Sequence, residues 1–122
     1  MSISQYNQAK IYYLEVVTQD VRLICESYKK TLGLSFGDPV TELGDARTAT
    51  LSNGEILGVR APMHEAEEPA TRPYYLVDDI EKAVAEAEAS GAEIAVPPME
   101  IPGHGKCAIL FYGEIQSGLW QV

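Results

Sequence analysis

The chain has 122 residues and a formal net charge of −9, so it is long enough for one domain and too acidic for a nucleic-acid or anionic-membrane partner. Its two cysteines show neither CxxC nor metal-finger spacing, which favours reduced thiols in a cytoplasmic protein. No apolar run approaches the ~20 residues of a membrane span, and the first residues lack the apolar core of a secretion signal.

The first half of the chain predicts a βαβββ module over residues 11–60. Asp20 caps an amphipathic helix, and Gly33 ends it because glycine readily takes the left-handed conformation of a helix C-terminus. Asn53-Gly54, between two strand-like runs, is a strong hairpin signal. The predicted strands are residues 11–17, a segment that begins with 34–36, residues 47–51 and residues 55–59.

The second half predicts the same plan over residues 72–122, after a linker at 61–71 that carries two prolines and three glutamates. Asp78-Asp79 offers a helix N-cap. Pro97-Pro98 is expected to break a strand. The predicted elements are strand 73–77, helix 79–90, and strands 92–96, 106–112 and 116–121.

The two halves can be aligned through their capping aspartates, so that Tyr13 corresponds to Arg72 and Glu15 corresponds to Tyr74. Neither half alone buries both faces of its sheet, so a repeat of this size predicts two modules with paired sheets. We therefore expect an α+β fold: one domain of two βαβββ modules that form an open, incomplete barrel around a cup, with the helices outside. The modules could pair within one chain or between two chains.

Several segments carry a family resemblance across residues 11–122. They are VTQD and TLGL in the first half, and YLVDDIEKAVAEAEASGAEI, VPPMEIPGHGKCAIL and GLWQV in the second. With the repeat, these segments resemble the vicinal oxygen chelate superfamily of glyoxalases, bleomycin-resistance proteins and extradiol dioxygenases, and its glyoxalase-like branch in particular. The resemblance implies the fold above and a homodimer; this scaffold hosts many chemistries.

The resemblance also locates where a metal-dependent relative would take its ligands. In those relatives a histidine lies on the first strand of a module and a glutamate on the last strand. The corresponding residues here are Tyr13 and Gly58, and Arg72 and Gly118. Arginine stays protonated and glycine has no side chain, so these positions predict no metal and no other cofactor.

The cup is therefore expected to bind a small organic molecule. The two-residue period of strands puts Tyr13, Glu15, Arg72 and Tyr74 on inward faces, with open floor above the glycines. Arg72 could hold a carboxylate or phosphate. Alternatively, Glu15 and Arg72 pair with each other and only satisfy burial, and the tyrosines serve as packing.

Four other side chains are interpreted from their local sequence. His104, between two glycines on a hairpin turn, could fold over the cup as a ligand-binding lid residue or general base. His64 is expected to be solvent-exposed, and Cys107 to be a buried structural thiol. Trp120 lies either in the core or on the rim.

Two functions follow from these residues. The first is a metal-free, bleomycin-resistance-like protein that holds a small ligand in the cup. The second is a glyoxalase-like lyase or isomerase that works without a metal or with a non-standard metal site. The vacant ligand positions favour the first, and the likeness to the glyoxalase-like branch supports the second.

Overall fold

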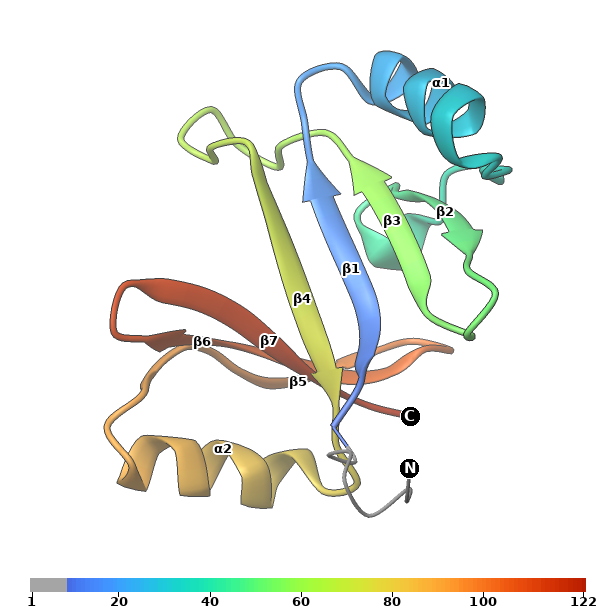
Figure 1. Ribbon diagram of the computed structural model, residues 1–122. Coiled ribbons are helices and arrows are strands. Elements are labelled where there is room, and N and C mark those ends of the chain that lie inside the picture. Colours follow the sequence, from blue (N-terminus) through green and yellow to red (C-terminus); the bar gives the residue numbers. More distant parts are fainter. Residues whose placement is uncertain (1–8) are drawn as a thin grey trace.

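The computed structural model describes residues 9–122 and contains seven strands and two α-helices (Figure 1). The elements are β1 (Ile11–Val17), α1 (Val21–Leu32), a 3-10 turn (Thr41–Leu43), β2 (Arg47–Thr50), β3 (Ile56–Arg60), β4 (Ala70–Leu76), α2 (Ile80–Ala89), β5 (Glu93–Ile101), β6 (Gly105–Tyr112) and β7 (Ile115–Gln121).

All seven strands belong to one mixed sheet in the order β2-β3-β1-β4-β7-β6-β5. The strands of the first module lie on one side of the β1–β4 junction and those of the second module on the other. Because β1 and β4 pair directly, the modules join within a single chain. The expected α+β class and open, unclosed sheet are confirmed.

Matching backbone positions show that the two modules are repeats. In each module the first strand runs parallel to the last one, and Glu15 faces Gly58 as Tyr74 faces Gly118. Each helix begins at the predicted aspartate: Asp20 accepts a hydrogen bond from the Leu23 amide, and Asp79 from that of Lys82. The superposition of the halves through these caps therefore extends to their last strands.

The first module has one strand fewer than predicted. Residues 34–36 form no strand, although the Gly37 amide donates to the Thr48 carbonyl at 2.9 Å beside β2. The Gly-Asp-Pro sequence that follows breaks the ladder, since proline has no N–H and restricts the residue before it. Arg47 donates instead to the Gly37 carbonyl at 3.0 Å. An isolated bridge between Val40 and Ala46 is the remaining trace of pairing.

Pro97-Pro98 does not end a strand, contrary to the prediction. β5 continues through both prolines to Ile101, with shifts in register between Ile94 and Val96 and between Val96 and Met99. β5 lies at the outer edge of the sheet, where a residue without N–H is tolerated. β4 likewise begins at Ala70, inside the predicted linker.

The helices cover the outer face of the sheet, as predicted, but not to the same extent. α2 lies along β5 and β6 and buries Ile80 against Leu110 and Leu119. α1 lies near the ends of β1 and β3 (Figure 1) and packs through Cys25 on Val16 and Val59. Neither helix in residues 9–122 has the length and apolarity needed to cross a membrane.

Candidate functional site

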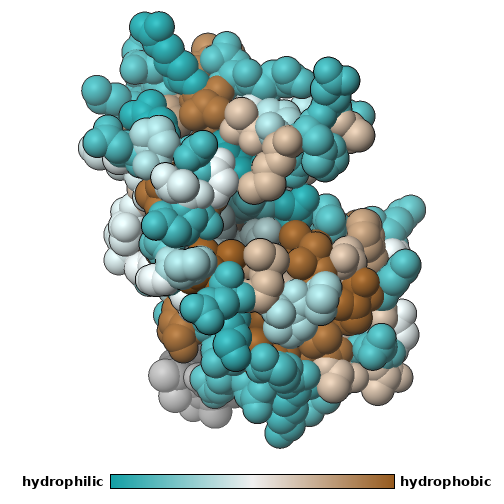
Figure 2. Space-filling view, turned by 180° about the vertical axis from the view of Figure 1, so that it is seen from behind, coloured by the Kyte–Doolittle hydropathy of each residue, from teal (hydrophilic) through white to brown (hydrophobic). Residues whose placement is uncertain are grey.

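The inner face of the sheet carries a cavity of about 430 Å³, bounded by both modules and by the β3–β4 loop. Seen from behind, the molecule is hollowed between its upper and lower halves, with hydrophobic residues gathered below the hollow (Figure 2). We call this cavity the cup. Its lining includes four of the five predicted ligand-binding residues: Tyr13, Glu15, Arg72 and Tyr74.

Glu15 lies at the centre of a buried polar cluster. It faces Arg72 across the β1–β4 junction, and its Oε1 accepts hydrogen bonds from Arg72 Nη1 and, at 3.0 Å, from Tyr74 Oη. Its Oε2 accepts from Arg60 Nε at 2.7 Å. Glu15 and both arginines are at least nine-tenths buried, so the anion and the two cations depend on each other for compensation. The predicted Glu15–Arg72 pair is therefore present.

The second partner of Arg60 comes from the β3–β4 loop. Arg60 donates to both carboxylate oxygens of Glu67, from Nη1 at 2.8 Å and from Nη2 at 2.7 Å. This bidentate pair, with the backbone amide of Met63 at 2.7 Å, lowers the pKa of Glu67 to about 2. The loop is thus attached to the floor of the cup through the Glu67–Arg60–Glu15 chain.

Arg72 retains hydrogen-bonding capacity. Its Nη2 donates to Gln116 Oε1 at 3.0 Å and its Nη1 to Glu15, while its buried Nε has no partner. A guanidinium carries five N–H groups, so an oxygen acceptor in the cup could use those that remain. Among the described residues, Arg72 is the cup-lining cation with a buried donor left unsatisfied.

Tyrosine rings occupy the floor that the sequence predicted to be open. A Cβ on Gly58 would overlap the phenol end of Tyr13, and one on Gly118 would overlap the ring of Tyr74. Glycine is required at both positions because aromatic groups lie directly on the backbone there. Burial raises the pKa of both phenols, so both keep their protons near neutral pH.

Trp120 completes an aromatic cluster inside the cup. It stacks on Tyr13 at a centroid distance of 5.2 Å and meets Tyr74 edge-on at 5.4 Å. Its Nε1 donates to the backbone carbonyl of His104 at 2.6 Å. That bond fixes the β5–β6 turn, but His104 is not among the cup-lining residues. Trp120 therefore belongs both to the buried core and to the wall of the cup. The role of His104 as a ligand contact stays a prediction.

The second module supplies an apolar wall. Val96, Met99, Ile101 and Ile109 line the cup, and the register shifts in β5 explain how one strand provides three of them. Ile94 packs on the helix side, whereas Val96 and Met99 both face the cup, because bulges re-aim side chains. Cys107 also lines the cup, where burial raises its pKa to about 11 and keeps it a thiol.

A metal does not fit this set of residues. The four positions that correspond to metal ligands in the resembled family hold Tyr13, Gly58, Arg72 and Gly118, and the Arg72 guanidinium already neutralises Glu15. In the part of the chain that the structure describes, no three His, Cys, Asp or Glu residues are close enough to hold a metal ion. Two buried cations beside one carboxylate disfavour a third cation there.

Sequence reasoning missed several cup residues. Arg60 follows Gly58 by two positions on β3, so strand periodicity could have placed it on the inner face. Gln116 precedes Gly118 by two positions on β7, which places it on the inner face by the same periodicity. Glu67 and the exposed His64, also in the lining, come from an irregular loop in which no periodic pattern identifies them.

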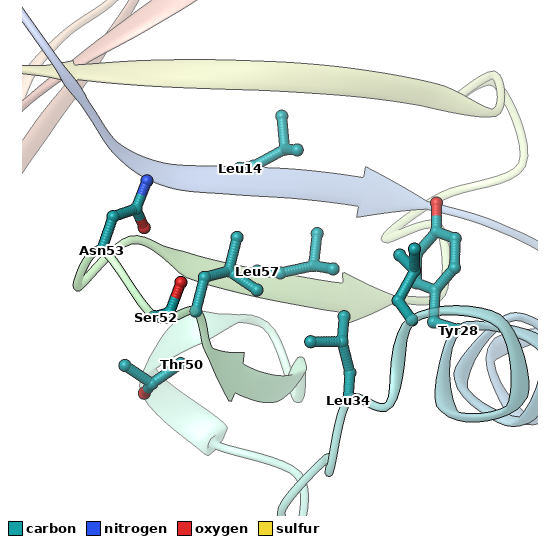
Figure 3. A pocket seen from close by; sticks show the side chains of 9 residues that line it. Leu14, Tyr28, Leu34, Thr50, Ser52, Asn53 and Leu57 are labelled. Atoms are coloured by element: carbon teal, nitrogen blue, oxygen red, sulfur yellow. The ribbon is translucent and has the colours of Figure 1, made fainter.

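A second depression, of about 550 Å³, lies on the opposite side of the sheet, beside α1 (Figure 3). Its lining is mainly leucine, with Tyr28 and the polar tip of the β2–β3 hairpin at its margin. The lining residues are Leu14, Tyr28, Leu32, Leu34, Thr50, Leu51, Ser52, Asn53 and Leu57. It lacks the convergent charged groups that distinguish the cup.

No family model and no curated protein sequence matches the chain. Solved structures do match its fold. A hypothetical protein, BH1468 from Bacillus halodurans C-125, has a TM-score of 0.75 at 13% identity, over 95% of this chain and 96% of that one. Methylmalonyl-CoA epimerase from Mycobacterium tuberculosis has a TM-score of 0.70 at 13% identity, over 91% and 86%.

A third match is a methylmalonyl-CoA epimerase in complex with methylmalonyl-CoA and NH4+, with a TM-score of 0.67 at 15% identity, over 94% of this chain and 95% of that one. The epimerases belong to the vicinal oxygen chelate superfamily, so the resemblance noted in the sequence is confirmed at the level of the fold. At these identities the matches define an architecture, and the chemistry has to be argued from the cup itself.

Proposed function

We propose that the protein binds a small organic molecule in the cup, without a metal. The observation that carries this proposal is the juxtaposition of Arg72, whose buried Nε lacks a partner, with a wall of Trp120, Met99 and Ile109 in one cavity. An oxygen acceptor of the ligand would meet Arg72 and Gln116, and a flat or aliphatic part would lie against the apolar wall.

The cup favours binding over catalysis. A lyase or isomerase without a metal needs a general base, and Glu15 is the buried carboxylate placed centrally enough. Both of its oxygens already accept hydrogen bonds from cationic or phenolic donors, so a substrate proton would have to compete with these donors for either oxygen. The glyoxalase-like enzyme is therefore the weaker of the two candidates.

The cup also favours a compact ligand over a coenzyme A derivative of the kind bound by an epimerase with this fold. The several phosphate charges of such a ligand need several cations, but the cup lining offers two arginines, and both pair with the buried Glu15. The chain also carries a formal net charge of −9. We expect small acids, amides or carbonyl compounds to bind more tightly than coenzyme A thioesters.

A ligand screen by thermal shift and NMR tests this proposal. Met99 is 48% exposed on the apolar wall, so Met99→Ala should fold normally and weaken binding of any hit by about fivefold to tenfold. Leu23→Ala, on a 58% exposed residue of α1 outside the cup, is the matched control. The cup would be excluded as the binding site if hits shift neither Met99 nor Trp120 resonances, or if they bind Met99→Ala with unchanged affinity.

Elemental analysis of the purified protein tests the absence of a metal. We expect no stoichiometric Zn, Ni, Mn or Fe. A stoichiometric metal that is lost in Tyr13→Phe or Arg72→Ala would overturn the metal-free proposal. Arg22→Ala on α1 controls for the loss of an arginine elsewhere.

We also propose a cytoplasmic homodimer. Both cysteines are free and buried, which suits a reducing compartment, and several large hydrophobic side chains are exposed, including Leu32 and Ile115 at 63% each. The cup is complete within one chain, so ligand binding should not depend on dimer formation. Light scattering over a range of concentrations measures the oligomeric state.

A further inference from the structure

Arg60 has the construction of an anion-binding site. Its side chain is 4% exposed, its Nε is fixed by Glu15 at 2.7 Å, and its two terminal nitrogens face a carboxylate in bidentate geometry. Guanidinium groups held in this way select planar carboxylates. The carboxylate present is the chain's own Glu67.

Glu67 differs from the other members of the polar cluster in how it is held. Glu15, Arg60 and Arg72 project from strands of the central sheet. Glu67 belongs to the irregular loop between Arg60 and Ala70, most of whose residues are exposed. The loop contributes a few further bonds, such as the Glu67 amide to the His64 carbonyl at 3.1 Å. Displacement of the Glu67 carboxylate would therefore disturb no strand pairing.

The charges of the cluster change when Glu67 leaves. With Glu67 in place, two guanidinium groups face two carboxylates and the formal sum is zero. Without it, two guanidinium groups face Glu15 alone and the sum is +1. Glu42 and His64, which also line the cup, make none of the cluster's ion pairs. A cup relieved of Glu67 would attract a monoanion at Arg60.

We infer that Glu67 is a built-in competitor, and that the natural ligand is an apolar monocarboxylate that replaces it on Arg60. The inference rests on the proposed function and names its ligand class. The ligand's carboxylate would take the two Arg60 nitrogens, and the loop would move outward. The ligand's apolar part would lie on the wall formed by Trp120, Met99 and Ile109. Any further oxygen acceptor of the ligand would meet Arg72 and Gln116, as proposed above.

Competition of this kind lowers the apparent affinity for carboxylates by the fraction of molecules in which Glu67 is withdrawn. Removing the Glu67 charge should therefore tighten carboxylate binding and leave the binding of a neutral isostere unchanged. If Glu67 occupies Arg60 in nine molecules of ten, the gain is about tenfold.

The experiment measures dissociation constants for matched pairs of probes: benzoate to 4-phenylbutyrate, each with its primary amide, at pH 7. In Glu67→Gln and in Glu67→Ala we expect at least about tenfold tighter binding of the acids and less than twofold change for the amides. Glu68→Gln is the control, because it removes the same charge from an exposed neighbour in the same loop.

A second measurement uses the unaltered protein. An acid probe that displaces Glu67 should speed cleavage of the loop after Glu65 and Glu67 by a glutamate-specific protease, and the matching amide should not. Acids that bind equally to the unaltered protein and both Glu67 variants, without any change in cleavage, would overturn the inference and leave the proposed function intact. If neither acids nor amides bind at all, both proposals fail.

Discussion

The two modules share a backbone plan but contribute different side chains to the cup. The first supplies Glu15 and Arg60, and the loop that leaves it supplies Glu67. The second supplies Arg72 and Gln116 to the polar cluster, and it also supplies Trp120 and the apolar residues of β5 and β6. Each module presents the same strand positions at the junction, so the asymmetry comes from side chains and from one missing strand, and not from a different fold.

The pairing at the junction shows how the side chains of the two modules differ at equivalent positions. The pseudo-symmetry relates the cross-strand pair Tyr13–Tyr74 to the pair Arg72–Glu15. One pair forms part of an aromatic cluster, and the other is a buried ion pair. A polar half and an apolar half in one cavity suit a ligand with two chemically different ends.

The largest effect is expected from the polar half. Glu15→Leu leaves Arg60 and Arg72 without their shared anion in a buried site, which should lower the free energy of unfolding by about 3–5 kcal/mol. Urea unfolding followed by circular dichroism measures it. Glu42→Leu, on an exposed residue of the same cavity, should change stability by less than about 0.5 kcal/mol. A Glu15 variant as stable as the Glu42 one would show that the ion pairs are not structurally required.

The next effect compares the two glycines. Gly58→Ala and Gly118→Ala each place a methyl group on a tyrosine and should cost about 1–3 kcal/mol. At Gly58 the nearest atom is the phenol oxygen of Tyr13, so Tyr13→Phe should recover part of the loss; at Gly118 the nearest atoms are ring carbons, so Tyr74→Phe should not.

Gly37→Ala is the control for both glycines, since a Cβ there meets only the Thr48 carbonyl at 3.9 Å. Thermal unfolding of the single and double variants gives the coupling energies. Equal rescue in both modules would contradict the difference between a contact with the phenol oxygen at Gly58 and a contact with ring carbons at Gly118.

A smaller effect compares the tyrosines themselves. Tyr74 Oη donates to Glu15 at 3.0 Å, so Tyr74→Phe should cost about 1–2 kcal/mol. Tyr13 Oη is buried without a partner, so Tyr13→Phe should be neutral or slightly stabilising. Chemical denaturation of the two variants tests whether identical substitutions at paired positions have opposite consequences. Destabilisation of Tyr13→Phe by 1 kcal/mol would indicate an unrecognised partner for that hydroxyl.

The smallest effect concerns the loop and depends on pH. The pKa of Glu67 is about 2 in the folded protein and 4.5 in its unperturbed state, so the folded state favours the carboxylate. Its contribution is complete above pH 4.5 and is lost as the pH falls toward 2. At pH 7 we expect the free energy of unfolding of the original protein to be about 1 kcal/mol higher than that of Glu67→Gln. This difference should disappear as the pH falls from 4.5 to 2. An unchanged gap at pH 2.5 would exclude the ion pair as its source.

The sequence predicted the architecture well because the repeat, the helix caps and the strand periodicity all depend on local chemistry. Asp20 and Asp79 begin both helices, and the inward positions of Glu15 and Arg72 follow from a period of two. The strand expected from 34–36 did not form, because the Gly-Asp-Pro sequence that follows interrupts the ladder at once. The predicted strand break at Pro97-Pro98 was wrong, because the effect of a proline depends on whether its strand lies at an edge of the sheet.

The contents of the cup were harder to predict. Vacant glycines suggested open floor, but the volume above a glycine depends on the rotamers of Tyr13 and Tyr74, which sequence spacing does not determine. Glu67 reaches Arg60 through an aperiodic loop. Contacts of this kind become visible only when the backbone is known in three dimensions.

The prolines of β5 have a consequence for the whole sheet. β5 is one of the two outermost strands, and a free strand edge can recruit a strand from another molecule and begin aggregation. Pro97 and Pro98 offer no N–H to such a strand, and the shifted register on either side of Val96 and Met99 disturbs the regular spacing that it would need. The irregularity that turns three apolar side chains toward the cup also makes this edge unfavourable for further strands.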